Sequence, residues 1–99
     1  MDKERVRTLL LRYNLTDFET KVLMRTFDIP KGKTVSYKQL AASCGRPRAY
    51  RAVGNIMHKN PLPLIIPCHR VVASGRKIGG YAYGTRMKKL LLKSEGATA

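Results

Sequence analysis

The sequence predicts a mainly α fold of the winged helix-turn-helix type, with a small β hairpin or wing. Apolar residues recur at helical spacing in several segments. A short helix, a turn with Gly45 and a longer helix are expected in succession over about residues 36–59, the order of a helix-turn-helix. After them, Val71–Ala73 and Ile78–Gly80 flank Ser74-Gly75, as in a hairpin. Ninety-nine residues allow one modest core, so we expect a single domain over residues 1–99.

The first two helices are expected over residues 3–13 and from Thr16 to just before Pro30. Thr16 and Glu19 have capping-box spacing, in which each side chain bonds a backbone N–H at the helix start. Pro30 then ends the second helix. The residues expected to face inward are Val6, Leu9, Leu10 and Tyr13 in the first helix and Phe18, Val22, Leu23 and Phe27 in the second.

The remaining elements are placed by similar signals. Ser36 and Gln39 form a second capping box, which opens a helix that ends near Ser43. Pro47 suits the first position of a helix that runs to about Lys59. Residues 64–66 (Leu-Ile-Ile) are expected as a buried extended run after the stiff segment 61–63. The last helix is expected over about residues 85–95, and its inward residues would be Met87, Leu90 and Leu91.

The net charge of +14 is unevenly distributed along the chain. Residues 1–28 hold six basic and five acidic side chains, whereas residues 29–94 hold fourteen Lys or Arg and no Asp or Glu. Such a segment cannot balance its charge internally and attracts polyanions. We therefore expect nucleic acid as the partner; a basic surface kept for solubility is the alternative. A membrane surface is not favoured, because no helix pairs its basic residues with a broad apolar side.

Composition favours an intracellular globular protein. The chain is 43% hydrophobic and 26% charged, has no apolar run that could cross a bilayer, and does not begin with a signal-peptide pattern. Its two cysteines fit a reducing compartment. We expect a cytoplasmic monomer, or a nuclear one in a eukaryote, without a cofactor. No metal site is expected, since Cys44, His58, Cys68 and His69 lack the usual spacing of zinc ligands.

The candidate chemistry centres on residues 66–71 (Ile-Pro-Cys-His-Arg-Val). A thiol attacks as thiolate, and neighbouring positive charge lowers its pKa. His69 and Arg70 follow Cys68 in the acid-free segment, and Pro67 fixes the backbone before the thiol. On these residues alone, a reactive thiol and a buried structural cysteine both remain open.

The run of residues 60–72, Asn-Pro-Leu-Pro-Leu-Ile-Ile-Pro-Cys-His-Arg-Val-Val, resembles the active-site signature of the O6-alkylguanine-DNA alkyltransferases. The resemblance extends over about residues 17–96. Further matching blocks, in the same order, are Ile29-Pro30-Lys31-Gly32, Val35-Ser36-Tyr37, Arg51-Ala52-Val53-Gly54, Gly79-Gly80-Tyr81 and Leu91–Gly96. It implies a DNA repair protein that transfers a methyl or alkyl group from O6 of guanine, and less well from O4 of thymine, to its own Cys68. On this resemblance, the transfer would be irreversible and would occur once per molecule.

The resemblance also implies roles for the other catalytic residues. His69 would act through a water as the base that maintains the thiolate, and Glu95 would orient His69. Glu95 is the sole carboxylate after Asp28; its alternative is a helix end without function. Asn60 would shape the site and tie the helix-turn-helix to the active-site turn, which is compatible with a helix-capping role.

The substrate would be double-stranded DNA from which the damaged nucleotide is flipped out, because the target atom lies inside the duplex. The resemblance assigns the Tyr37 hydroxyl to the leaving guanine, and the backbone carbonyls of Cys68 and Val71 to the exocyclic amine of guanine. Arg51 would fill the vacated base stack from the minor groove. The expected backbone contacts are Lys38, Arg46 and Ser74, each of which has a solvated surface position as its alternative.

Two departures from the family pattern concern the pocket and the recognition helix. Ala82 and Tyr83 are expected beside Val71 in the base pocket, and Tyr83 stands where glycine or another aromatic residue is common, which puts the pocket width in question. Ile56 stands where a small residue is common. The rival functions are a non-enzymatic alkyltransferase-like protein, which would lack the acceptor cysteine, and a helix-turn-helix regulator, which would leave Cys68 idle.

Overall fold

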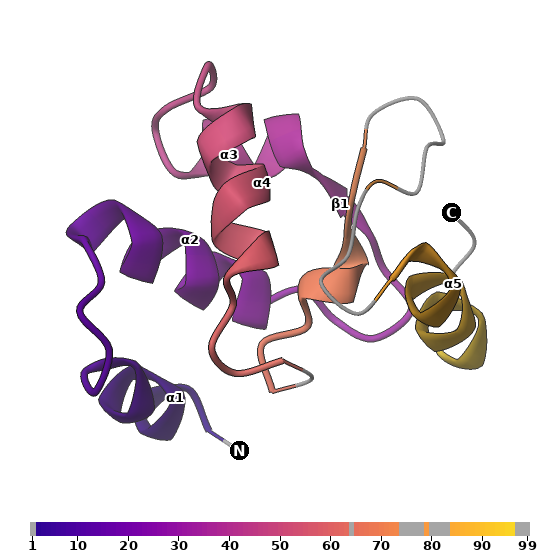
Figure 1. Cartoon of the computed structure of the whole chain (residues 1–99), viewed down its shortest axis with the longest axis horizontal. Helices are drawn as coiled ribbons and strands as arrows, with labels where there is room; N and C mark the ends of the chain where they lie inside the picture. Colours follow the sequence, from indigo (N-terminus) through magenta and orange to yellow (C-terminus); the bar gives the residue numbers. More distant parts are fainter. Residues whose placement is uncertain (1, 64, 74–78, 80–83, 97–99) are drawn as a thin grey trace.

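Helices make up most of the described chain, which in this computed structural model comprises residues 2–63, 65–73, 79 and 84–96 (Figure 1). This part is therefore mainly helical, as the sequence predicts. The elements in chain order are α1 (Lys3–Leu10), α2 (Asp17–Phe27), β1 (Val35–Ser36), α3 (Tyr37–Ser43), α4 (Tyr50–His58), the one-turn 3-10 helix η1 (Cys68–Arg70), β2 (Val71–Val72) and α5 (Thr85–Ser94).

Two capping boxes start α2 and α3 where the sequence predicts them. Thr16 caps α2, and its hydroxyl accepts from the Glu19 N–H at 3.1 Å while the Glu19 carboxylate accepts from the Thr16 N–H at 2.9 Å. Ser36 and Gln39 form the same reciprocal pair at the start of α3, at 3.0 and 2.9 Å. Because each box satisfies two N–H groups that the helix leaves without partners, both starting points are fixed locally.

The helix-turn-helix pair is formed by α3 and α4, which pack against each other and on α2 (Figure 1). The turn after α3 passes through Gly45, whose φ of 83° lies in the left-handed region that glycine adopts without strain. Residues 47–49 form a turn, and α4 begins at Tyr50. The expectation that Pro47 opens the helix is therefore wrong by three residues.

Two helices differ from the sequence prediction in extent or face. The helix α1 ends at Leu10, and Leu11 and Tyr13 beyond it are 79% and 43% exposed, so Tyr13 is not the inward residue expected. In α5, Met87 and Leu90 are also exposed, whereas Lys88 and Leu92 are the fully buried residues. Leu91 is partly buried against the core, as expected. The prediction for Met87 and Leu90 fails because the tertiary environment buries a lysine instead, which sequence patterns assign to the surface.

The strands β1 and β2 pair in parallel, with Val35 opposite Val71 and Ser36 opposite Val72. This pairing brings the start of α3 beside the segment that follows Cys68. The expected second half of a hairpin or wing, residues 74–78 and Gly80, lies outside the described residues. In the run expected to be buried, Ile66 is fully buried but Ile65 is 37% exposed, and Leu64 lies outside the described residues.

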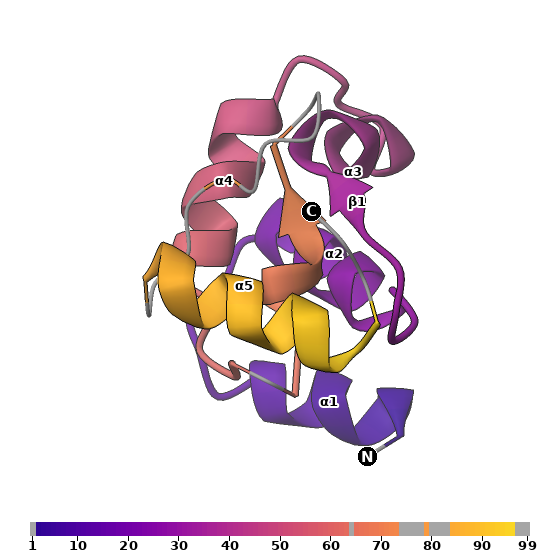
Figure 2. The same cartoon turned by 90° about the vertical axis from the view of Figure 1, so that its right-hand side faces the viewer.

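The core lies between the helix-turn-helix pair, α1, α2 and the β1–β2 layer, and α5 lies against η1 on the other side of the strands (Figure 2). Its largest fully buried side chains include Leu10, Leu23, Ile66 and Leu92. Among the residues described, no helix is long and apolar enough to cross a membrane.

Candidate active site

Cys68 opens the one-turn helix η1, directly after the buried Pro67. The turn is held by backbone bonds from Cys68 N to the Ile66 carbonyl at 2.8 Å and from Arg70 N to the Pro67 carbonyl at 2.9 Å. Cys68 and His69 are only 4% and 2% exposed. Both side chains are therefore enclosed before any substrate arrives.

Asn60 joins the end of α4 to this turn. Its amide nitrogen donates to the Ile66 carbonyl at 2.9 Å, and its amide oxygen accepts from the Leu62 N–H at 3.0 Å. A hydrogen bond between its side chain and the Cys68 thiol lowers the pKa of Cys68. One side chain thus fixes the segment on both sides of residues 63–65 and also reaches the thiol.

The electrostatics of Cys68 differ from the sequence expectation. Burial raises the pKa of the thiol, and this effect outweighs the lowering contributions of Asn60 and of the Lys88 charge. Arg70 was expected to favour the thiolate, but its guanidinium is bound to other groups. The positive charge that acts on Cys68 comes from Lys88, twenty residues along the chain.

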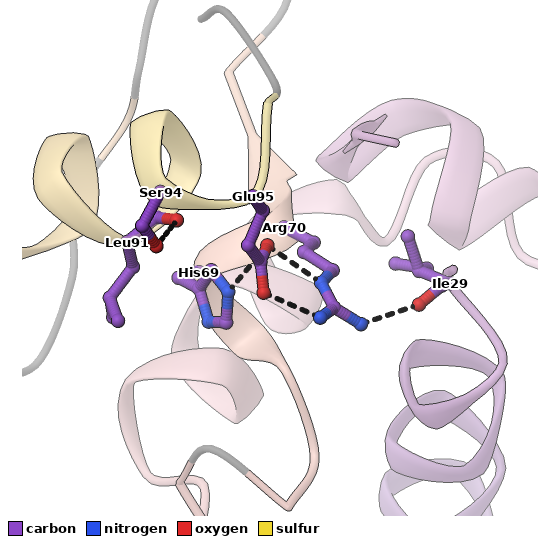
Figure 3. Close-up of polar contacts among 6 residues, drawn as sticks. All are labelled: Ile29, His69, Arg70, Leu91, Ser94 and Glu95. Carbon is purple, nitrogen blue, oxygen red and sulfur yellow. Dashed lines mark hydrogen bonds and ion pairs between the residues drawn. The ribbon is translucent and has the colours of Figure 1, made fainter. Parts of the chain in front are cut away.

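The carboxylate of Glu95, at the C-cap of α5, interacts with both His69 and Arg70 (Figure 3). Its Oε1 lies 3.0 Å from His69 Nε2 and accepts from Arg70 Nε at 3.0 Å, while its Oε2 accepts from Arg70 Nη2. The Arg70 guanidinium holds the pKa of Glu95 below its usual range, although burial opposes this. The structure therefore brings the expected pair of His69 and Glu95 into contact.

The surroundings of His69 favour its neutral imidazole form. Burial lowers its pKa, and the nearby charges of Arg70 and Lys88 lower it further; Glu95 raises it, but burial dominates. Because an ionised Glu95 only accepts hydrogen bonds, Nε2 of His69 carries the proton and Nδ1 keeps the lone pair. A neutral histidine with this tautomer is able to accept a proton at Nδ1.

Lys88 is the site residue that sequence reasoning missed. Its side chain is fully buried, its Nζ donates to the Val71 carbonyl at 2.6 Å, and it lies 5.6 Å from the centre of the Tyr37 ring. Burial lowers its pKa to about 8, against the opposing effect of Cys68. One sequence signal could have found it: Lys88 precedes Glu95 by seven residues, so both lie on the same side of α5.

Tyr37, the first residue of α3, is half-buried and lies between Lys88 and Gly79. A Cβ at Gly79 would lie 3.0 Å from both Cε2 and the hydroxyl of Tyr37 and 3.1 Å from the Ala73 nitrogen. Gly79 also has a φ of 76°. The glycine therefore permits a close approach that any side chain would obstruct.

Three of the expected DNA-binding residues are exposed on the helix-turn-helix. Arg51 is exposed in the first turn of α4. Lys38 lies over the ring of Tyr50 at 5.3 Å, and Arg46 lies over the ring of Phe18 at 4.6 Å. Ile56 is buried, so its side chain fills core space in α4. Ser74, Ala82 and Tyr83, also expected at the DNA interface or base pocket, lie outside the described residues.

The described residues contain no group of three or more His, Cys, Asp or Glu side chains that could hold a metal ion. Cys44 is buried at the end of α3, where its sulfur lies 4.0 Å from the Ser43 hydroxyl.

Comparison with known proteins places residues 17–97 in a family model described as the DNA-binding domain of 6-O-methylguanine DNA methyltransferase. The methylated-DNA–protein-cysteine methyltransferase of Methanosarcina barkeri is 51% identical over 80 residues, which cover 81% of this chain and 51% of that protein. The chain thus spans about half the length of this relative.

Solved structures agree in fold. Mycobacterium tuberculosis OGT in complex with DNA is 41% identical, with a TM-score of 0.80 over 83% of this chain and 50% of that one. S. pombe Atl1, in complex with damaged DNA containing O6-carboxymethylguanine, is 33% identical, with a TM-score of 0.73 over 85% of this chain and 80% of that one. This chain belongs to the 6-O-methylguanine DNA methyltransferase family and carries its DNA-binding domain.

Proposed function

We propose that this protein repairs DNA by moving an alkyl group from O6 of guanine to Cys68, once per molecule. The observation that supports this most directly is the grouping of Asn60, His69, Lys88 and Glu95 around one enclosed cysteine. A structural cysteine needs only apolar neighbours, whereas these four side chains supply a base, its orienting carboxylate, a cation and a hydrogen-bond partner for the thiol.

The reaction follows from this arrangement. Sulfur attacks the alkyl carbon as the thiol proton passes, through a bridging water, to Nδ1 of the neutral His69. The S–C bond forms, the C–O6 bond breaks, and its electron pair stays with guanine, which takes a proton from the Tyr37 hydroxyl. Glu95 stabilises the resulting imidazolium. The thioether has no good leaving group, so the protein is consumed by one reaction.

The basic residues of segment 29–94 and the exposed side chains of the helix-turn-helix would bind the DNA. Arg51 at the start of α4 fills the base stack after the nucleotide has been flipped into the pocket. Lys38 and Arg46 contact phosphates from the same side, and each is held over an aromatic ring. Ser74 is proposed as a further backbone contact; Val71, Ala82 and Tyr83 line the pocket for the base.

The second candidate is a damage-binding protein without transfer activity. It is favoured by the similarity to Atl1, which covers 80% of that chain and was solved with damaged DNA. The two candidates differ in one expected property. Binding alone gives no use to an enclosed thiol with a neighbouring base, whereas transfer requires both, so the contacts around Cys68 favour transfer.

The test is the intact mass of the protein after incubation with duplex DNA that contains O6-methylguanine. We expect one added methyl group, located on the peptide that contains Cys68. Cys68→Ser should abolish the addition while DNA affinity stays close to that of the unmodified protein, because phosphate contacts dominate binding. Cys44→Ser is the matched control and should react normally, since Cys44 is equally buried but lies at the end of α3. Binding without any mass change would leave the damage-binding candidate.

A further inference from the structure

Arg70 connects three segments that are distant in sequence. Its Nε and Nη2 donate to the two oxygens of Glu95 at the end of α5, and its Nη1 donates to the Ile29 carbonyl, two residues after α2, at 2.8 Å (Figure 3). The side chain is 15% exposed, and the Glu95 side chain is 11% exposed. A planar guanidinium that grips a carboxylate with two donors fixes its orientation as well as its position.

This geometry removes Arg70 from the roles that its sequence position suggests. The guanidinium faces Glu95 and the α2 end, so it is not presented to a phosphate, and it is not among the groups that act on the pKa of Cys68. It is nevertheless the largest influence on Glu95, whose pKa it lowers.

The charged groups that face His69 come from two elements. From α5, Glu95 raises the pKa of His69 and Lys88 lowers it; from η1 itself, Arg70 lowers it. Cys68 is the neighbouring titratable group on η1. Glu95 is therefore shared: the carboxylate that contacts His69 Nε2 also accepts two hydrogen bonds from the Arg70 guanidinium.

We propose that Arg70 is a positioning residue that acts through Glu95. It holds the carboxylate against His69 Nε2 while offsetting its charge, and so adds to the effect of burial in keeping His69 a neutral base. This inference rests on the proposed transfer reaction. An isolated Glu95 carboxylate would favour an imidazolium before the substrate arrives, and an imidazolium has no lone pair to accept the thiol proton. With Arg70 in place, Glu95 can orient His69 without making the imidazole so basic that it is already protonated.

The test is an NMR titration of the two histidine rings in the unreacted full chain. His58, exposed at the end of α4, supplies a second ring signal from outside the candidate active site. Arg70→Gln should raise the pKa of His69, because the carboxylate loses its guanidinium partner. Glu95→Gln should lower it, because the raising contribution disappears. Opposite shifts from two partners of one ion pair are not expected of a merely structural contact.

Two further variants separate charge from geometry. Arg70→Lys keeps the charge but loses the two-pronged grip, so His69 should titrate close to its original pKa while transfer from free O6-alkylguanine slows about tenfold. Lys3→Ala is the matched control: it breaks an exposed ion pair with Asp28, beside the Ile29 contact, and should change neither measurement.

An unchanged or lowered His69 pKa in Arg70→Gln would overturn the inference. If Arg70→Gln does not fold, Arg70→Lys decides. A lowered His69 pKa in that variant, as expected for Glu95→Gln, would show that the charge of Arg70 does not set the protonation state of His69. The titration needs no transfer reaction, so its failure is distinguishable from failure of the proposed function, which the intact mass reports.

Discussion

The buried ammonium of Lys88 donates to the backbone carbonyl of Val71 at 2.6 Å. This carbonyl is one of those expected to accept from the exocyclic amine of guanine. A carbonyl oxygen has two lone pairs, so the lysine leaves one of them for the base. The same lysine influences Cys68 by its charge and lies over Tyr37, and it therefore connects the expected base-reading, nucleophilic and proton-donating groups.

Lys88→Met should raise the pKa of Cys68, because a positive charge that favours the thiolate is lost while the burial that opposes it remains. Transfer from free O6-alkylguanine should then slow on the order of tenfold at neutral pH and recover as the pH rises. The pH dependence of the transfer rate, measured on the free base to exclude effects on DNA binding, gives the result.

Lys89→Met is the control for Lys88, since Lys89 is the exposed neighbour on α5. It should leave the rate profile with free base unchanged. Equal slowing in both variants would mean that α5 tolerates no apolar substitution in this turn, and the electrostatic role of Lys88 would be abandoned.

The pKa of Lys88, lowered to about 8, also predicts a stability effect. A lysine whose folded pKa is below its unfolded pKa destabilises the fold while it is protonated. Its cost is greatest below about pH 8 and disappears as the pH rises to the unfolded value of about 10.4. Lys88→Met should therefore increase the unfolding free energy relative to the unmodified protein most at neutral pH. This gain should decrease as the pH rises from about 8 to about 10.4. A difference that does not vary with pH would show that only packing had changed.

Arg51→Ala should slow repair of duplex DNA strongly, on the order of tenfold or more, because nothing then fills the gap left by the extruded base. Free O6-alkylguanine needs no extrusion, so its reaction should be almost unaffected. A mismatch opposite the lesion should partly restore the rate.

Arg48→Ala is the matched control for Arg51, because Arg48 is exposed in the turn just before α4. If it contacts only phosphate, lower salt should restore its activity and a mismatch should not. Rescue of Arg51→Ala by low salt alone would show that Arg51, too, contacts only phosphate. Equal losses of rate on free base and on duplex DNA would show that Arg51 supports the fold.

Gly79→Ala should displace Tyr37, since the new methyl group would lie 3.0 Å from two atoms of its ring and hydroxyl. The positive φ adds strain, for a total cost of about 1 to 3 kcal/mol in unfolding free energy. Gly45→Ala is the control, because it has a similar φ of 83° but no atom within 4 Å of its Cβ. Transfer should be slower in Gly79→Ala alone; similar rates in both variants would exclude an effect through Tyr37.

Sequence patterns predicted correctly those features that depend on neighbouring residues. The starts of α2 and α3 follow from Thr16 and Ser36 because each capping box is complete within four residues. The contact between His69 and Glu95 spans twenty-six residues and was accessible only through resemblance to a family.

The failures have a common physical cause. Lys88 is buried because a carbonyl of β2 and the ring of Tyr37 receive its charge, and Arg70 turns inward because Glu95 and the end of α2 do the same. These partners are all distant in sequence from the cation that they bind. Rules that place isolated cations at the surface therefore predicted the wrong buried face for α5, and they named Arg70 where Lys88 supplies the positive charge that acts on Cys68.

The position of α5 also has a consequence for the order in which the site is completed. Lys88 lies in this helix and Glu95 is its C-cap, whereas Cys68 precedes both. During synthesis from the N-terminus, the thiol is therefore made before the cation that acts on it and before the carboxylate that orients its base. Until α5 docks on η1, Cys68 lacks both the Lys88 charge and the carboxylate that contacts its neighbour His69, so the site is assembled only when this helix has been made.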